Sequence, residues 1–284
     1  MRLVIISGLS GSGKSVALNV LEDTGFYCID NIPVGLLRSF VKEIRRRQDS
    51  DYDQVGVGLD ARNLPDIDEL PELIEELRTD GETCELVFLQ ANDDVLLSRF
   101  SETRRKHPLT TESVSLPEAV SEERRLLGPI IDMADLVIDT SSTTVYDLRD
   151  LVRDRVASRA DTALSILIES FGYKHGIPAD ADFVFDVRCL PNPYWEPKLR
   201  PLNGTDQSVR DFLNAQPQVV DMIGDVESFL RQWIPHYETF QRAYLTIAIG
   251  CTGGQHRSVF VAESLAERLQ DAHGPIQTRH FELS

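Results

Sequence analysis

The sequence lacks long hydrophobic runs and a recognisable export signal. No apolar stretch approaches the roughly 18 residues that cross a bilayer, which excludes a membrane-spanning helix. The N-terminus passes from a single arginine directly into the apolar residues 3–6, without the charged start, longer apolar stretch and cleavage site of a signal peptide. We therefore expect a cytoplasmic protein without a membrane partner.

Cysteines are few and widely separated. The residues Cys28, Cys84, Cys189 and Cys251 show no paired spacing. A disulfide framework needs several cysteines in a short chain, and a structural zinc site needs close pairs of ligands. Neither kind of site is expected here.

Basic residues are scarce relative to acidic ones. Lysine and arginine number 29 against 46 aspartates and glutamates, which gives a formal net charge of -17. An acidic chain repels polyanions on average, and this disfavours nonspecific binding to nucleic acids or anionic membranes. The basic clusters at residues 45–47 and 104–106 fit either solvated helix faces or local phosphate contacts.

The remaining composition is that of a globular protein with room for two domains. Hydrophobic residues make up 42% and charged residues 26% of the 284 residues. Strand-type runs at residues 2–7, 26–30, 55–60, 85–91 and 135–139 alternate with amphipathic stretches at residues 36–47 and 70–78. This alternation predicts right-handed βαβ units around a parallel sheet, and therefore an α/β fold.

A polar stretch separates this pattern from the second half of the chain. Residues 153–162 are mixed in charge and poor in large apolar side chains, so we expect the domain boundary there. We predict an N-terminal domain over residues 1–155 and a C-terminal domain over residues 162–284. Strand candidates at residues 164–168 and 244–249, with helices at about 219–240 and 256–272, predict a second α/β domain.

A phosphate-binding motif follows the first predicted strand. Residues 8–15 match the pattern G-x-x-x-x-G-K-[ST] in full, between an apolar strand and a helix. The glycines let successive N–H groups turn toward phosphate oxygens, and the helix N-terminus adds the positive end of its dipole. Lys14 is expected to act catalytically on the β- and γ-phosphates, and the Ser15 hydroxyl to bind Mg²⁺. The predicted nucleotide-binding residues are Gly8, Leu9, Ser10, Gly11, Ser12, Gly13, Lys14 and Ser15.

A P-loop enzyme also needs a carboxylate at a strand end to hold the magnesium shell. Asp30, Asp60 and Asp139 each end an apolar run, and a strand-end turn or helix cap is the alternative for each of them. We favour Asp60 as the catalytic and metal-binding carboxylate because the polar residues 61–63 follow it. Asp30 stays open as the other candidate.

A basic stretch further along resembles the arginine-rich lids of small nucleoside and nucleotide kinases. It contains Arg99, Arg104, Arg105 and His107. Guanidinium groups above the phosphates would offset charge in a phosphoryl-transfer transition state. An exposed helix with solvated arginines is the alternative.

A second glycine-rich turn, at residues 250–258, lies between a predicted strand and a predicted helix. It combines a glycine-rich backbone, including Gly254, with a helix N-terminus and Arg257, which is suited to bidentate phosphate contact. Cys251 and Arg257 also have the C-x5-R spacing of cysteine phosphatases, although a glycine precedes the cysteine. A noncatalytic site for a phosphorylated small molecule is the favoured interpretation. A thiol phosphatase and a purely structural turn remain as alternatives.

Six motifs together resemble the RapZ/YvcJ family of P-loop nucleotide-binding proteins, and the resemblance covers essentially the whole chain. They are GLSGSGKSVALNVLEDTGFYCIDNIP, LDARN, RRKHPL, SFGYKHGIP, FDVRCLPNPYWEPKLRPL and GCTGGQHRSV. The resemblance implies an N-terminal P-loop NTPase domain like that of small nucleotide kinases, with weak ATPase and GTPase activity. It implies ATP binding at residues 8–15 and GTP binding at Asp60, Ala61, Arg62 and Asn63.

The resemblance also implies a C-terminal domain that, in some members, senses an amino-sugar phosphate and acts as an RNA-binding adaptor for an RNase. The residues that match the pocket motifs are Lys174, His175, Asp186, Arg188, Asn192, Cys251, Thr252, Gly253, His256 and Arg257. Two positions depart from the family pattern. Tyr194 stands where sugar-sensing members carry a histidine, and the tail at residues 277–284 lacks the basic cluster of the RNA adaptors.

These observations predict a regulatory protein that binds ATP and GTP with Mg²⁺ and hydrolyses them slowly. Its C-terminal domain would bind a phosphorylated metabolite and pass that state to a protein partner, and the family suggests a homo-oligomer. Two alternatives belong to other classes: a small-molecule kinase that uses the P-loop and the arginine lid, and an RNA-binding adaptor. RNA binding is expected to be weak.

Overall fold

The computed structural model of the chain describes residues 1–47, 52–59, 69–158, 164–240, 242–274 and 276–283. The chain forms two compact units, Met1–Asp161 and Thr162–Ser284, and each unit has its own sheet and core. None of the helices in the described ranges combines the length and the apolar character that a bilayer crossing requires.

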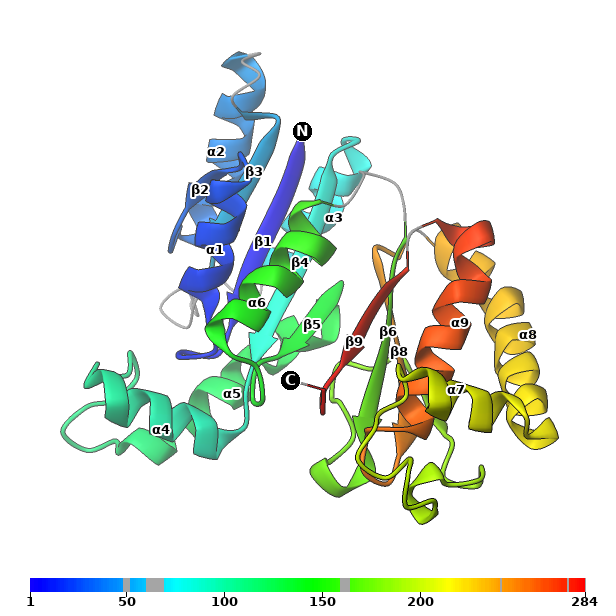
Figure 1. Cartoon of the computed structure of the whole chain (residues 1–284). Helices are drawn as coiled ribbons and strands as arrows, with labels where there is room; N and C mark the ends of the chain where they lie inside the picture. The colour runs from blue at the N-terminus through cyan, green and yellow to red at the C-terminus, as the bar shows by residue number, and fades with distance from the viewer. Residues whose placement is uncertain (48–51, 60–68, 159–163, 241, 275, 284) are drawn as a thin grey trace. The chain divides into compact units, whose positions relative to one another are not determined.

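A five-stranded parallel sheet forms the centre of the first unit (Figure 1). Its strands are β1 (Arg2–Gly8), β2 (Tyr27–Ile29), β3 (Gln54–Gly58), β4 (Thr83–Gln90) and β5 (Leu136–Asp139), in the spatial order β2-β3-β1-β4-β5. All the pairings are parallel. The loops that follow β1, β3 and β4 therefore leave the sheet at one edge, where parallel sheets bind their ligands.

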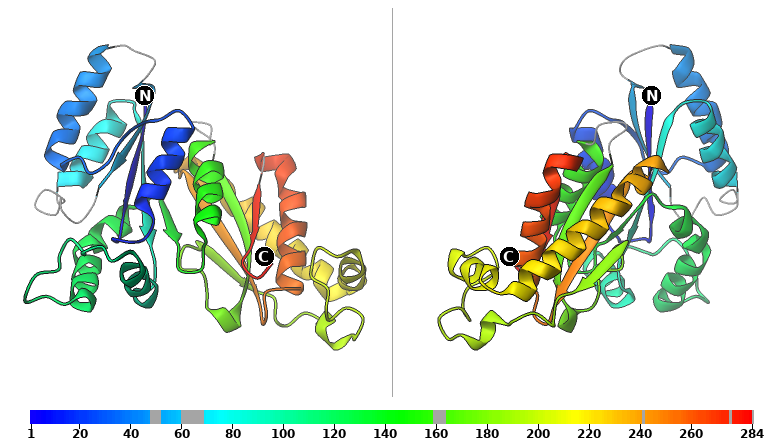
Figure 2. Two further views of the ribbon diagram at one scale, coloured as in Figure 1. Left: turned by 60° about the vertical axis from the view of Figure 1, so that its left-hand side comes forward. Right: turned by 90° about the vertical axis from the view of Figure 1, so that its right-hand side faces the viewer.

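Helices pack on both faces of this sheet (Figure 2). The helices α1 (Lys14–Asp23) and α6 (Val145–Val152) lie on one face, and α2 (Val34–Arg47), α3 (Leu70–Thr79) and α5 (Leu116–Met133) lie on the other. The helix α4 (Asp93–Thr103) packs against α5. All the residues of β1 are buried because both faces are covered, which explains why residues 3–6 at its centre are all apolar.

The sequence pattern did not reveal α5 and α6, although both begin with recognisable capping boxes. Ser115 and Glu118 exchange hydrogen bonds at the start of α5, and Thr144 and Asp147 do so at the start of α6. The polar stretch at residues 153–162, which we predicted as the domain boundary, is helical over its first five residues. The residues Arg153–Ala157 continue α6 as the π-helix η3, and Val156 within it is fully buried.

A four-stranded parallel sheet forms the second unit. Its strands are β6 (Ser165–Gly172), β7 (Phe183–Asp186), β8 (Tyr244–Cys251) and β9 (Gln277–His280), in the spatial order β7-β8-β6-β9. The helices are α7 (Gln207–Asn214), α8 (Pro217–Thr239) and α9 (Arg257–His273), with the short 3₁₀ turns η4 (Tyr173–His175) and η5 (Pro193–Trp195). The helix α9 packs on β6 and β8, and α8 packs on α9.

The predicted α/β class of both halves is confirmed by these two parallel sheets. The strands β7 and β9 were missed. Both are four-residue edge strands, and β9 has the polar sequence QTRH, so neither leaves a strong apolar pattern. In the structure, β7 pairs with β8 and β9 pairs with β6 through parallel backbone hydrogen bonds.

Candidate functional site

The P-loop connects the central strand β1 to α1, at the ligand-binding edge of the first sheet. Gly8 has a φ of 146°, and a Cβ atom at this position would lie 2.2 Å from the carbonyl oxygen of Leu89. Gly11 and Gly13 have φ values of 87° and 108°, in the left-handed region that favours glycine. The three glycines of the motif are therefore required by the backbone path.

Within the loop, the lysine amine is held by main-chain oxygens. Lys14 Nζ donates hydrogen bonds to the carbonyl oxygens of Gly8, at 2.6 Å, and Leu9, at 3.3 Å. The Ser12 N–H and hydroxyl both donate to the Leu9 carbonyl. Ser15 lies exposed in the first turn of α1.

The three candidate carboxylates have different surroundings. Asp139 Oδ1 accepts the Ser141 N–H at 2.8 Å, so Asp139 caps a strand-end turn. Asp30 is exposed after β2, and its carboxylate lies against Gly58 at the end of β3, where a Cβ atom would be 2.6 Å from Oδ1. Asp60 and the predicted GTP-binding residues Ala61, Arg62 and Asn63 lie outside the described residues.

The basic stretch does not act as a single exposed lid. Arg99, on α4, donates to the carbonyl oxygen of Gly11 at 3.0 Å and to Thr140 Oγ1 and O, and burial lowers the pKa of its guanidinium. Arg104 and Arg105 are exposed beyond the end of α4. His107 is 1% exposed. In this structure, Arg99 therefore braces the P-loop from the side.

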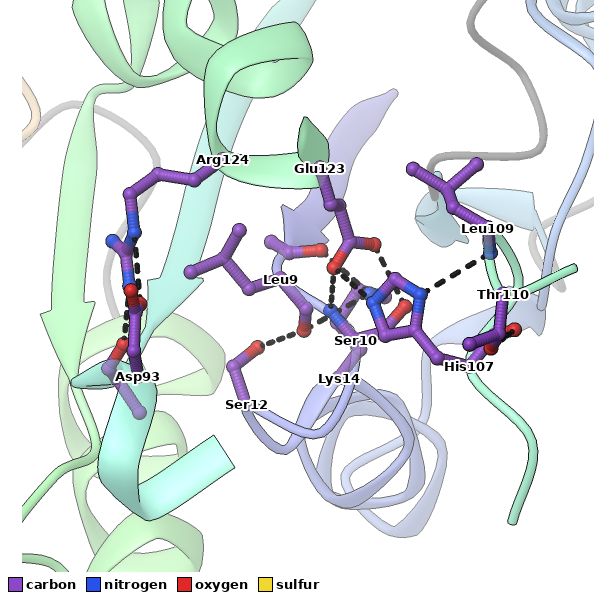
Figure 3. A network of polar contacts seen from close by, with 12 residues as sticks. Leu9, Ser10, Ser12, Lys14, Asp93, His107, Leu109, Thr110, Glu123 and Arg124 are labelled. Atoms are coloured by element: carbon purple, nitrogen blue, oxygen red, sulfur yellow. Dashed lines mark hydrogen bonds and ion pairs between the residues drawn. The ribbon is translucent and has the colours of Figure 1, made fainter. Parts of the chain in front are cut away.

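A buried carboxylate that sequence reasoning did not single out contacts the same loop (Figure 3). Glu123 of α5 is fully buried and accepts hydrogen bonds from Ser10 and His107. A signal for it was present in the sequence. On α5, Glu123 belongs to the buried stripe that also contains Ala119, Val120 and Leu127. An acidic residue on the apolar face of a helix is uncommon unless it is paired.

The second glycine-rich turn follows the central strand β8 and leads into α9. Gly172, at the end of β6, approaches it closely, since a Cβ atom on Gly172 would lie 2.8 Å from the Gly253 carbonyl carbon. Gly254 has a φ of 73° and packs against the Glu282 side chain, which accepts the Gly172 N–H at 3.1 Å. The turn is thus fixed between β6 and the C-terminal segment.

A pocket of about 400 Å³ opens beside this turn. Among the predicted ligand residues, those that line it are Lys174, Asn192, Cys251, Thr252, Gly253, His256 and Arg257. The pocket also contains Tyr194, Trp195 and Gln255, which were not predicted as ligand residues. His175, Asp186, Arg188 and Gly254 do not line the pocket.

Two of those non-lining residues form a pair beside η4. Arg188 binds Asp186 through an ion pair at 2.6 Å, and its guanidinium lies over the Tyr173 ring at 3.9 Å. The hydrogen bond from Arg188 lowers the pKa of Asp186. This pair fixes the loop that contains the Arg188 carbonyl, which in turn accepts a hydrogen bond from Arg257 at 2.6 Å.

Arg257 is buried at the start of α9 and has several acceptors. Its guanidinium donates to the carbonyl oxygens of Arg188 and Leu190 and, at 3.4 Å, to Thr252 Oγ1. These contacts use part of its donors, and the same side chain lines the pocket. Arg257 therefore braces the loop after β7 and presents positive charge to the pocket.

The Cys251 thiol is packed under the turn. It is 3% exposed, accepts the Gly254 N–H at 3.2 Å and lies 3.2 Å from Ser258 Oγ. His256 is also buried, which lowers its pKa, and its Nε2 lies 3.3 Å from the Leu199 carbonyl oxygen. The geometry thus brings a thiol, an arginine and a helix N-terminus together without exposing the thiol.

Both halves of the chain match family models of known proteins. The RapZ-like N-terminal domain matches residues 1–160, and the RapZ C-terminal domain matches residues 164–284. The chain belongs to the RapZ family. This confirms the resemblance that the six motifs carried.

Proteins from several bacteria match this RapZ family member over its full length. A protein of Pseudomonas fluorescens (strain SBW25), named a nucleotide-binding protein, is 52% identical over 285 residues and spans all of both chains. One from Alkalilimnicola ehrlichii with the same name is 52% identical and covers 100% of this chain and 99% of its own length. A third, from Stutzerimonas stutzeri (strain A1501), is 53% identical over 285 residues.

Solved structures similar to this chain include small kinases. A shikimate kinase from Bacteroides thetaiotaomicron aligns with a TM-score of 0.38 and 14% identity, covering 54% of this chain and 94% of its own. A gluconokinase from Sinorhizobium meliloti 1021 aligns with a TM-score of 0.36 and 18% identity, covering 53% of this chain and 89% of its own.

Proposed function

We propose that this protein is a regulatory nucleotide-binding protein that binds ATP and GTP with Mg²⁺ at the P-loop and hydrolyses them slowly. One observation carries the proposal: a complete P-loop follows the central strand of a parallel sheet and runs into α1, whose first two residues, Lys14 and Ser15, are the last two of the motif. Backbone amides, a helix N-terminus and an amine then converge on one anion-binding position. The relatives named nucleotide-binding proteins support the same assignment.

Mg²⁺ would be held together with the nucleotide phosphates. The Ser15 hydroxyl and one strand-end carboxylate, Asp60 or Asp30, are the residues we propose for its shell. The metal would neutralise charge on the phosphates as the terminal phosphoryl group leaves. Lys14 would leave the carbonyl oxygens of Gly8 and Leu9 to contact the β- and γ-phosphates.

The second unit is proposed to bind a phosphorylated small molecule, for which an amino-sugar phosphate is one candidate. Lys174, Thr252 and Arg257 line one pocket beside a glycine-rich turn and a helix N-terminus, a combination that suits a phosphate. Tyr194 and Trp195 at the same pocket offer faces on which the apolar side of a sugar ring can pack. We propose that the bound state is passed to a protein partner by a cytoplasmic homo-oligomer.

Two alternatives lead to different measurements. A small-molecule kinase would consume nucleotide rapidly only when its acceptor is present. A mobile arginine lid is disfavoured because Arg99 donates hydrogen bonds to Gly11 and Thr140. A thiol phosphatase would need Cys251 as an accessible nucleophile. Cys251 lines the pocket, but the residue is only 3% exposed. Both observations favour the regulatory protein.

Calorimetry and a phosphate-release assay on the full chain test the proposal. We expect saturable ATP and GTP binding and Mg²⁺-dependent turnover far below the typical enzyme median of about 10 per second. Turnover at or above that median would favour the kinase. Absence of nucleotide binding at millimolar concentrations would refute the proposal for the first unit.

A further inference from the structure

Glu123 is the central acceptor of a buried network between α5 and the P-loop (Figure 3). Its Oε2 accepts the Ser10 N–H at 2.8 Å, and its Oε1 accepts the Ser10 hydroxyl at 2.7 Å. His107 Nε2 lies 3.0 Å from the same Oε2. Glu123 has no solvent exposure, so water does not compete for these contacts.

The hydrogen bonds of His107 determine its tautomer. Its Nδ1 accepts the Leu109 N–H at 3.2 Å and therefore carries no proton. The proton of the neutral ring is then on Nε2, which donates it to Glu123. Burial alone would raise the pKa of Glu123, but the hydrogen bonds from His107 and Ser10 together lower it. Glu123 is thus an ionised carboxylate with three donors.

These contacts fix the first half of the P-loop. Ser10 is the third residue of the motif, and its N–H and its hydroxyl both donate to Glu123. On its other side, the Gly11 carbonyl oxygen accepts from Arg99. The loop is therefore held at two adjacent residues by side chains from α4 and α5, before any phosphate binds.

We infer that Glu123 is a positioning residue for nucleotide binding. Glu123 sets the shape of the P-loop through its hydrogen bonds with Ser10. Through its contact with His107, Glu123 also links the shape of the loop to the basic segment 104–106. The inference rests on the proposed nucleotide binding. The proposed effect of Glu123 on nucleotide binding is geometric. Its hydrogen bonds leave the remaining loop amides in place for phosphate oxygens. His107 directly follows the basic segment 104–106, so movement of this segment toward a bound phosphate would pull on the carboxylate that holds the loop.

The two substitutions Glu123→Gln and Glu123→Ala separate geometry from charge. The glutamine oxygen can accept from the Ser10 N–H and His107, while its NH₂ group donates to the Ser10 oxygen, because a hydroxyl can exchange its donor and acceptor roles. All three contacts survive without the negative charge. Alanine removes all three. The matched control is Glu122→Ala, the exposed neighbour on α5 that pairs only with Arg125 among the described residues.

The experiment titrates the full-length variants with a fluorescent ATP analogue, measures single-turnover hydrolysis, and records a melting curve for each protein. Glu123→Ala is expected to raise the Kd about 10- to 100-fold, the range for hydrogen bonds to a charged group, and to slow the single turnover. Glu123→Gln and Glu122→Ala should stay within about threefold of the parent protein. A purely structural role would lower the melting temperature without changing the Kd of the folded protein.

Ser10→Ala and His107→Ala test the same contacts from the other side, in case Glu123→Ala does not fold. Each is expected to weaken binding by at least about threefold. Unchanged affinity in all folded variants would overturn the inference, and so would a Glu123→Gln protein as defective as Glu123→Ala. If the parent protein itself binds no nucleotide, the proposed function fails, and this result is distinct from a failure of the positioning role.

Discussion

The amine of Lys14 lies 2.6 Å from the carbonyl oxygen of Gly8, so the lysine of the P-loop folds back on the first residue of its own motif. This contact holds the amine close to the turn that we propose for the phosphates. A bound triphosphate offers a stronger acceptor than a carbonyl oxygen, because its oxygens are charged. The lysine can therefore exchange one partner for the other without a large displacement of the backbone.

Lys14→Ala is expected to weaken ATP and GTP binding and to abolish hydrolysis. The change removes a hydrogen bond between charged groups, worth about 1.5–3 kcal/mol, or roughly 10- to 100-fold in affinity. Calorimetry and phosphate release measure both effects. Lys42→Ala, on the exposed face of α2, is the control with the same loss of charge. Unchanged affinity and turnover in Lys14→Ala would contradict the assignment.

Asp60→Asn is expected to damage Mg²⁺-dependent hydrolysis more than magnesium-free nucleotide binding, because a neutral amide is a poorer magnesium ligand than a carboxylate. The comparison is made with Asp30→Asn, whose carboxylate lies against Gly58, and with Asp139→Asn, whose carboxylate caps a turn. If Asp30→Asn alone loses hydrolysis, the metal assignment belongs to Asp30.

In the second unit, Arg257→Ala is expected to abolish binding of a sugar phosphate or inorganic phosphate and also to lower the melting temperature. The fold is affected because the buried carbonyl oxygen of Leu190 loses its donor, at a cost of about 1–3 kcal/mol, and the partly buried carbonyl oxygen of Arg188 loses one as well. Lys174→Ala, an exposed residue of the same pocket, should weaken phosphate binding without the change in stability.

Cys251→Ser is expected to leave phosphate binding largely intact, since the backbone amides and Arg257 would hold the anion. A phosphatase assay with a generic phosphomonoester provides the contrasting measurement. Phosphatase turnover that disappears with the cysteine would establish the thiol enzyme and refute the noncatalytic pocket.

Alkylation with iodoacetamide at pH 8 should modify Cys189 first. Burial and the negative charge of Glu22 raise the pKa of Cys28 to about 11, and burial raises that of Cys84 to about 12. The reactive thiolate is then only about 10⁻³ of Cys28 and about 10⁻⁴ of Cys84 at this pH. Cys189 is exposed. Peptide mass spectrometry measures the order, and rapid labelling of Cys84 in the folded protein would contradict it.

The isolated protein is expected to bind structured RNA only weakly, in the micromolar range or above at physiological salt, because its C-terminal segment, residues 251–284, carries few cations. In residues 251–284, the basic residues are Arg257, Arg268 and Arg279, against the acidic residues Glu263, Glu267, Asp271 and Glu282. Arg257 is buried, and Arg268 pairs with Glu227 at 3.1 Å. A filter-binding titration tests this prediction. Nanomolar, sequence-selective binding at about 150 mM salt would contradict it and would indicate a basic surface formed by an oligomer.

The sequence by itself determined the P-loop and the fold class. The motif at residues 8–15 is local, so its spacing alone predicts glycine-dependent turns, and Gly8, Gly11 and Gly13 all have positive φ. The strands β1, β4 and β8 each contain an apolar run, at residues 3–6, 86–89 and 247–249, since parallel strands are buried on both faces. The pattern located these strands within a few residues.

Only the tertiary structure decided how distant residues combine. Glu123 follows Ser10 by 113 positions, and no local pattern links an acidic residue on α5 to the P-loop. Arg99 likewise resembled a lid residue in sequence but bonds to Gly11, because the packing of α4 and α5 brings its guanidinium to the side of the loop. The hydrogen-bond partners of a buried side chain depend on which helices and strands lie next to it, and the order of the strands in the sheet determines this. That order is set by packing over the whole unit.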